Sequence, residues 1–281
     1  MRVLKPFDPW GSELCTCPKK YSLHPYTGCT HSCLYCYATS YVGRRFSSPK
    51  RSFLEMLRRD LIKADQRIPV ELSTSSDPYT PEELSLGITR ASLALLKSKE
   101  FKVLITTKGS GFPLDEGIYD SVMVTVTTLD KHLSSKLEPS APSPSRRIDS
   151  LAEVSVRKGV RVDPIIPGLN DDLDGIKALL REARDAGAEH VTFSMYKAKP
   201  DSLRRILNSF PEISNELEYL YVKEGVLIRG YRYLRAGVRY EILSKAVEEA
   251  LKLGMSASVC REGFPDLMRS KSCDGTHLLS T

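Results

Sequence analysis

Three cysteines, Cys29, Cys33 and Cys36, stand in the spacing Cys-x3-Cys-x2-Cys. Cubane iron–sulfur clusters normally take four cysteine thiolates and structural zinc normally takes four ligands, so the triplet is one ligand short. Three thiolates this close can hold three irons of one [4Fe–4S] cube and leave the fourth iron open to a ligand from outside the protein. An open iron is typical of a catalytic cluster. The alternatives are a zinc knuckle, for which His31 is a poor fourth ligand, and three unrelated buried cysteines.

Four further cysteines stand near the two ends of the sequence: Cys15, Cys17, Cys260 and Cys273. Their surroundings are rich in Gly, Pro and charged residues, a composition typical of metal-binding loops. Four thiols could ligate a second iron–sulfur cluster or, less favourably, a zinc ion. The alternatives are disulfides between the two stretches and thiols that share no site. The count favours an auxiliary metal centre, although it does not establish that the four lie together.

The composition narrows the class of protein. With 281 residues, of which 41% are hydrophobic, the chain can bury a large core, and α/β barrels of this size are routinely one domain. The sequence has no run of roughly 18 apolar residues and no basic-then-apolar leader, so we expect no membrane contact and no export. Seven cysteines then indicate metal ligation in a reducing cytoplasm. The net charge of +6 permits a polyanionic partner without demanding one.

Short β-branched runs alternate with helical patterns from residue 70 to about residue 195. This alternation predicts βαβ units and a parallel sheet, and hence the α/β class. Six strands are expected, near residues 20–25, 70–74, 101–107, 122–127, 160–166 and 189–195, with helices within residues 81–97, 145–158 and 171–186. From about Lys199 the pattern becomes mostly helical.

The triplet, with the aromatic Tyr35 before its last cysteine, resembles the radical SAM superfamily. Within it the chain is most similar to the spore photoproduct lyase-like group, often labelled DNA repair photolyase-like. The motifs that carry this resemblance cover about residues 21 to 170 and comprise His24–Cys29, Cys36–Ala38, Ser76–Tyr79, Thr106–Lys108, Glu138–Pro142, Arg147 and Pro164–Gly168. The resemblance implies a partial (βα)6 TIM-type barrel over residues 21–198. It leaves an N-terminal Cys-x-Cys segment over residues 1–20 and a mostly helical C-terminal extension over residues 199–281.

The resemblance also implies an activity. A [4Fe–4S] cluster on the triplet would bind S-adenosylmethionine (SAM) at its open iron, and an electron from a donor such as ferredoxin or flavodoxin would cleave SAM to a 5′-deoxyadenosyl radical. The first hypothesis is that this radical repairs or modifies DNA or RNA. A second is an enzyme that acts on a small molecule or a protein with the help of an auxiliary cluster. A third is a non-enzymatic iron–sulfur module.

Candidate cofactor contacts follow from the rule that chemistry gathers at the carboxyl ends of parallel strands. Lys108, which ends an apolar strand, could neutralise the methionine carboxylate of SAM, although an ordinary solvated lysine is an equal alternative. Gly168 could admit backbone close to the adenine. By resemblance, Ser75, Lys108 and Thr127 fall near the lyase's SAM contacts, and Tyr35 and Tyr37 match tyrosines that flank its last cluster cysteine. The expected cofactor contacts are Tyr35, Ser75, Ser76, Asp77, Lys108, Thr127, Ile166 and Gly168, with Tyr37 as candidate catalytic residue. For Ser75, Ser76 and Asp77, turn chemistry is the alternative.

One departure from the lyase pattern concerns the substrate. The lyase carries a hydrogen-donor cysteine in a Cys-Thr-Ser-Asp run after its second strand, and here the run is Thr74-Ser75-Ser76-Asp77. We therefore do not expect a thymine-dimer lyase that quenches a product radical from that thiol.

A run of basic residues offers a candidate nucleic-acid contact. The arginines recur at spacings of three, three and four, interleaved with tyrosines, and on a helix they would share one face; they are Arg229, Arg232, Arg235 and Arg239. Gly230 and Gly237 weaken the helix prediction, and a solvated charged face is the alternative. Arg44 and Arg45, with Lys50, Arg51, Arg58 and Arg59 downstream, add a second basic region just after the triplet.

Overall fold

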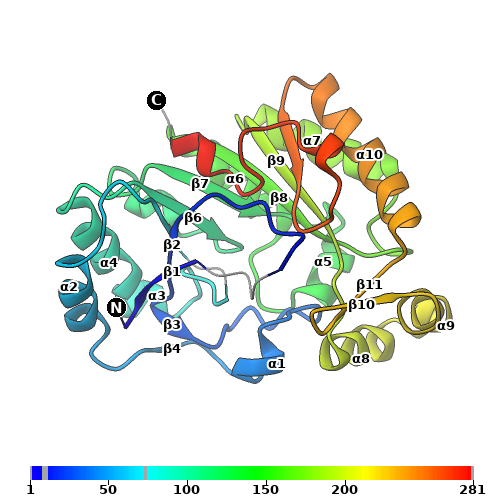
Figure 1. The fold of residues 1–281 in the computed structure, drawn as a ribbon, viewed down its shortest axis with the longest axis horizontal. Helices are drawn as coiled ribbons and strands as arrows, with labels where there is room; N and C mark the ends of the chain where they lie inside the picture. Colours follow the sequence, from blue (N-terminus) through cyan, green and yellow to red (C-terminus); the bar gives the residue numbers. More distant parts are fainter. Residues whose placement is uncertain (1, 8–11, 73–74, 280–281) are drawn as a thin grey trace.

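A computed structural model describes residues 2–7, 12–72 and 75–279 of the chain (Figure 1). Its centre is a sheet of eight strands in the order β1-β2-β5-β6-β7-β8-β9-β12. The strands span β1 (Leu4–Pro6), β2 (Tyr21–Leu23), β5 (Val70–Leu72), β6 (Val103–Thr107), β7 (Ser121–Thr125), β8 (Arg157–Ile165), β9 (His190–Met195) and β12 (Ser256–Val259). β1 pairs antiparallel with β2, and every other neighbouring pair is parallel.

Helices follow the strands along the chain. They span α1 (Thr39–Val42), α2 (Phe53–Leu61), α3 (Glu83–Leu86), α4 (Ile88–Lys97), α5 (Lys131–Leu137), α6 (Pro144–Ala152), α7 (Leu173–Asp185), α8 (Pro200–Ser209), α9 (Ser214–Glu218) and α10 (Ala236–Lys252). In Figure 1, α2 and α4 lie at one end of the sheet and α7 and α10 at the other. The helix expected within residues 81–97 is two helices, because Gly87 takes a left-handed backbone conformation (φ +59°) between them.

The α/β class and the partial-barrel expectation are confirmed, since six of the parallel strands fall where the sequence predicts them. β6 and β7 show why the strands could be predicted from the sequence. Nine of their ten residues are buried, and strands covered on both faces read as continuous β-branched and apolar runs.

The C-terminal region is mostly helical, as the sequence predicts, but it also contains three short strands. Alongside α8, α9 and α10 it contributes β12, a further parallel strand beside β9, and a hairpin of β10 (Val226–Ile228) and β11 (Tyr231–Tyr233). The region therefore extends the sheet as well as covering it. A small two-stranded sheet of β3 (Tyr26–Thr27) and β4 (Ser48–Pro49) completes the strands.

His190 on β9 gives this fold a specific dependence on pH. The imidazole is fully buried, with Nδ1 3.0 Å from Ser256 Oγ and Nε2 3.2 Å from Thr192 Oγ1. Burial, with a smaller contribution from His277, lowers the pKa of His190 to about 3. An unfolded histidine binds its proton near pH 6.5, so the unfolded chain takes up protons between those values while the native His190 stays neutral.

We therefore predict that stability is full above about pH 6.5 and falls as the pH drops toward 3. His190 alone contributes a slope of up to about 1.4 kcal/mol per pH unit in the free energy of unfolding. Urea unfolding from pH 7 to pH 5 measures that slope. His190→Gln should reduce the slope without removing it, because burial lowers the pKa of His24 to about 3 as well. His132→Gln, which replaces an exposed histidine on α5, should leave the slope unchanged. Equal slopes in the two variants would contradict this assignment.

Candidate active site

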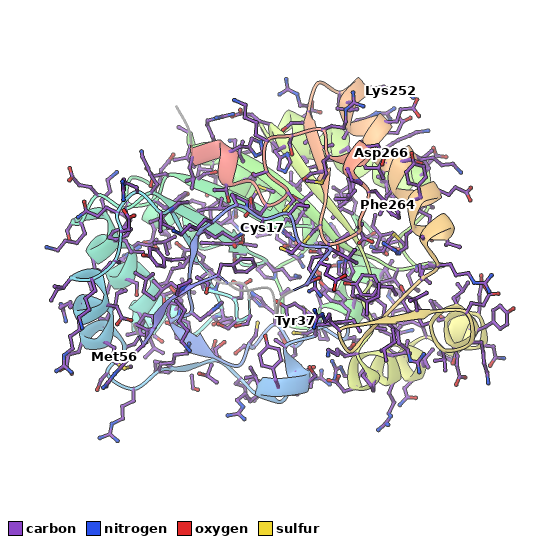
Figure 2. All side chains as sticks on the ribbon, viewed as in Figure 1. Cys17, Tyr37, Met56, Lys252, Phe264 and Asp266 are labelled. Carbon is purple, nitrogen blue, oxygen red and sulfur yellow. The ribbon has the colours of Figure 1, made fainter. Side chains whose placement is uncertain are left out.

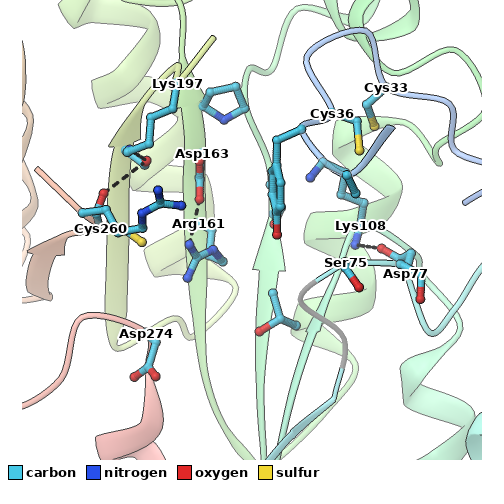
Figure 3. A pocket seen from close by; sticks show the side chains of 18 of the residues that line it. Cys33, Cys36, Ser75, Asp77, Lys108, Arg161, Asp163, Lys197, Cys260 and Asp274 are labelled. Carbon is cyan, nitrogen blue, oxygen red and sulfur yellow. Dashed lines mark hydrogen bonds and ion pairs between the residues drawn. The ribbon is translucent and has the colours of Figure 1, made fainter. Parts of the chain in front are cut away.

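A cavity of about 560 Å³ opens at the carboxyl edge of the parallel sheet (Figure 3). Residues that follow or end the strands line it, among them Asp77 after β5, Lys108 after β6, Thr125 on β7 and Asp163 on β8. Cys29, Cys33 and Cys36 line the same cavity, as the sequence predicts for an α/β active site.

The cysteine triplet lies in a loop between β3 and α1 that the rest of the molecule holds in place. The Leu34 N–H donates to the Leu137 carbonyl at 2.8 Å, and the Arg205 guanidinium of α8 donates to the carbonyls of Leu34 and Cys36. The loop starts at Gly28, whose φ is +81° and where a Cβ would lie 2.5 Å from the Phe46 carbonyl oxygen. Only glycine fits this start without a shift of the backbone.

The three thiols fit a shared iron–sulfur cluster. Burial, helped by the charge of Asp77, raises the pKa of the Cys29 thiol to about 12. Burial raises the pKa of Cys33 well above its usual value, Lys108 opposes that rise, and Glu138, Cys29 and Cys36 add to it. The three thiols line one cavity, and in a cubane each thiolate binds a different iron.

Lys108 presents a cation to this cavity. Its ammonium lies 5.4 Å from the centroid of the Tyr35 ring. Burial lowers the pKa of Lys108, but Cys33, Glu138 and Asp163 outweigh burial and raise that pKa above its usual value. A protonated amine in a partly closed cavity is a suitable partner for a carboxylate ligand.

Asp77 fixes the backbone at Lys108, directly after β6. The Lys108 N–H donates to Asp77 Oδ2 at 2.6 Å, the Thr107 hydroxyl donates to Oδ1 at 2.6 Å, and His31 Nε2 lies 3.5 Å from Oδ2. Although burial opposes ionisation, His31 and these hydrogen bonds lower the pKa of Asp77. The carboxylate therefore fixes the end of β6 as well as lining the cavity.

Glu138 connects the cysteine loop to the sheet. The Tyr35 hydroxyl and the Arg147 guanidinium both donate to its carboxylate, and the Thr127 hydroxyl donates to Oε1 at 3.2 Å. Arg147 and Glu138 are both buried, and Arg147 also donates to the Thr125 carbonyl on β7 at 3.0 Å. Tyr35 thus lines the cavity with its ring while Glu138 holds its hydroxyl.

Three expected cofactor contacts lie outside the lining of this cavity. The Thr127 hydroxyl bonds to Glu138, the fully buried Ile166 donates its N–H to Asn170 Oδ1 at 2.7 Å, and Gly168 faces Ile213. Their hydrogen bonds and packing are already used within the protein, so a direct cofactor contact at Thr127, Ile166 or Gly168 does not follow from the cavity.

The other expected contacts do line it. Ser75 and Ser76 follow β5, and the Ser76 hydroxyl donates to the Tyr26 carbonyl at 3.0 Å. Tyr37 lies near the middle of the molecule (Figure 2), with its ring centroid 6.3 Å from that of Tyr231. Burial raises the pKa of Tyr37 well above its usual value, so the phenol is neutral.

Sequence reasoning missed the ion pairs on the far wall of the cavity. Arg161 pairs with Asp163 at 2.7 Å, and Lys197 pairs with Glu262 at 2.6 Å. A signal for the first pair was present, because residues two apart on a strand share a face and β8 carries these two charges within an apolar run.

The expectation that four arginines share one helical face is wrong. Arg232 lies on β11, Arg229 precedes it in the hairpin turn, and α10 begins only at Ala236. The turn forms because Arg229 and Gly230 both take positive φ, and β10 and β11 then pair. Arg239 is buried and pairs with Glu262, while Arg235 is exposed and pairs with Glu224 at 3.3 Å.

The four cysteines from the two ends of the sequence also lie at this site. Cys15, Cys17 and Cys260 line the cavity, and the Cys17 sulfur lies 3.2 Å from that of Cys273. In Figure 3, Cys260 lies across the cavity from Cys33 and Cys36.

No protein-family model matches the chain. An uncharacterised protein of Mycobacterium tuberculosis is 26% identical over 241 residues, which cover 76% of this chain and 71% of that protein. An uncharacterised protein of Methanocaldococcus jannaschii is 29% identical over 164 residues, which cover 54% of this chain and 62% of that protein.

Solved structures share the fold. Spore photoproduct lyase superposes with a TM-score of 0.67 at 15% identity, covering 92% of this chain and 79% of the lyase. SuiB of Streptococcus suis gives a TM-score of 0.53 at 12% identity, covering 85% of this chain and 48% of SuiB. The resemblance drawn from the sequence is therefore confirmed at the level of the fold. None of the described helices combines the length and apolar composition that a membrane span requires.

We predict that removing the Arg147 guanidinium, the charged partner of Glu138, destabilises the protein. In Arg147→Met a buried charge would lose its partner, and the free energy of unfolding should fall by about 3–5 kcal/mol. Arg146→Met is the matched control, since Arg146 is exposed on the same helix and pairs with Glu153 at the surface; it should cost at most about 1 kcal/mol. Urea unfolding at pH 7 measures both, and similar losses would contradict the role given to Glu138.

Proposed function

We propose that the chain is a radical SAM enzyme that repairs or modifies a nucleic acid. The observation that carries the proposed class is that Cys29, Cys33, Cys36 and the Lys108 ammonium share one cavity at the carboxyl edge of the sheet. The triplet would hold a [4Fe–4S] cluster, and Lys108 would pair with the carboxylate of SAM.

When bound, such a cluster with an external electron donor supplies the reductive cleavage of SAM to a 5′-deoxyadenosyl radical. The chain's own residues hold the cysteine loop and Lys108 in position. Arg205 and Glu138 fix the two sides of the cysteine loop, and Asp77 fixes the backbone that presents Lys108. The surrounding walls limit access of water to a reactive species. A donor such as ferredoxin or flavodoxin would supply the electron.

A basic and aromatic segment next to the triplet supports a nucleic-acid substrate. Arg44 and Arg45 are exposed, and with the three cysteines they line a second cavity of about 40 Å³ beside the loop. Phe46 is 72% exposed and Tyr41 is 52% exposed. Exposed arginines suit phosphates and exposed aromatic rings suit stacking of bases. A spore photoproduct lyase variant has been solved with AdoMet and a dinucleoside photoproduct. Thr74, which stands in for the lyase's hydrogen-donor cysteine, lies outside the described residues.

A second candidate, a radical SAM enzyme that acts on a small molecule or a protein beside an auxiliary centre, is favoured by one observation. Cys15, Cys17 and Cys260 line the cavity that the triplet lines. A protein that binds iron but never cleaves SAM would instead be an iron–sulfur module.

We predict that the anaerobically reconstituted and reduced protein converts SAM to 5′-deoxyadenosine and methionine, measured by chromatography. Lys108→Met removes a charge-assisted bond of about 1.5–3 kcal/mol, so the Kd for SAM should rise about 10- to 150-fold. Lys136→Met is the control, because Lys136 lies over the Phe210 ring and does not line the cavity. Unchanged SAM affinity in Lys108→Met would contradict the role of Lys108, and absence of cleavage would contradict the function.

We predict salt-dependent binding of single-stranded oligonucleotides, measured by fluorescence anisotropy between 50 and 200 mM salt. The double variant Arg44→Gln/Arg45→Gln should lower the slope of log K against log salt by about 1–2, because up to two phosphate contacts are lost. Lys97→Gln/Lys99→Gln removes the same charge from the exposed end of α4 and should leave the slope near wild type. Equal effects of the two doubles, or no binding at low salt, would count against a nucleic-acid substrate.

A further inference from the structure

The four outer cysteines converge although they come from opposite ends of the sequence. Cys17 and Cys273 are separated by 256 positions, yet their sulfurs lie 3.2 Å apart. Cys15, Cys17 and Cys260 line the same cavity. The proximity that cysteine counting leaves open is therefore present in the fold.

The parallel sheet fixes the C-terminal half of this group, which we call the outer cysteine cluster (Cys15, Cys17, Cys260 and Cys273). Cys260 directly follows β12, and its N–H donates to the Phe193 carbonyl of β9 at 2.9 Å. The Cys273 carbonyl accepts from the Thr192 hydroxyl at 2.8 Å and from the Ser258 hydroxyl at 3.1 Å. Two neighbouring strands thus present both thiols from a rigid base.

A buried lysine joins the N-terminal half to the same base. Lys20 pairs with Asp274, the residue after Cys273, and with Glu71 of β5 at 2.5 Å. Because Lys20 stands three residues after Cys17, its ion pair with Asp274 holds the N-terminal cysteines beside the C-terminal ones.

We propose that Cys15, Cys17, Cys260 and Cys273 ligate a second iron–sulfur cluster, on the wall of the cavity opposite Cys29, Cys33 and Cys36. Four thiolates satisfy every iron of a cubane. The outer centre would therefore leave no open iron for SAM. This inference does not rest on SAM cleavage.

Two other fates of the thiols are distinguished by the test. A Cys17–Cys273 disulfide, compatible with two sulfurs 3.2 Å apart, would leave Cys15 and Cys260 without a shared ligand. A zinc ion would take the same four thiolates without sulfide.

The test uses the Cys29/Cys33/Cys36→Ala triple variant, which retains only the outer cluster. After anaerobic reconstitution with iron and sulfide, the triple variant should hold about four irons and four sulfides per chain, and wild type about eight of each. The reduced triple variant should give an EPR signal that SAM does not alter. Wild-type iron and sulfide content gives the same answer even if the triple variant folds poorly.

Further substitutions in the triple variant locate the site. Removing Cys15 and Cys17, or Cys260 and Cys273, should abolish the remaining iron. Thr192→Val deletes only the hydroxyl that bonds to the Cys273 carbonyl and should retain most of it. Circular dichroism monitors folding throughout.

Four results would overturn the proposal. They are about four irons in wild type with none in the triple variant, zinc without sulfide, a Cys17–Cys273 disulfide found by mass spectrometry after alkylation, and four reactive thiols without metal. SAM cleavage by a wild-type protein with about four irons would refute the second cluster and leave the proposed function standing.

Discussion

The hydrogen bonds and the ion pair of the buried Glu138 carboxylate are the interactions on which the site depends most. The carboxylate accepts from Tyr35 in the cysteine loop, from Thr127 after β7 and from Arg147 on α6, so three segments meet at one charge. A buried ion pair contributes little net stability but is costly to break, because the remaining charge has no solvent. These bonds tie the cysteine loop to the sheet. Displacing Tyr35 would leave its hydroxyl without a partner and would remove one hydrogen bond from Glu138.

The cavity beyond this anchor is lined by charges that are mostly paired within the protein. Arg161 pairs with Asp163, and Lys197 with Glu262. Lys108 differs: its ammonium faces the Tyr35 ring, and its backbone, rather than its amine, bonds to Asp77. This contrast is the physical reason to assign Lys108 to a ligand carboxylate and the other cations to the architecture of the wall.

The positions of six parallel strands and the place of the cysteine triplet could be predicted from the sequence, because buried strands read as β-branched runs and short ligand spacings are local. Non-local features could not. β12 looked like part of a helical region, since its four residues carry little pattern. The spacing of Arg229 and Arg232 matched a helical repeat. Arg229 and Gly230 instead take positive φ and form the turn of a hairpin. The meeting of Cys17 with Cys273 depends on the whole fold.

The central claim is that the cysteine triplet holds a cluster with an iron that SAM can reach. EPR of the reduced, reconstituted wild-type protein, recorded with and without SAM, tests it most directly. The account predicts that SAM changes the signal of one cluster, and that this change is lost in the Cys29/Cys33/Cys36→Ala variant. A wild-type signal that is identical with and without saturating SAM would contradict it.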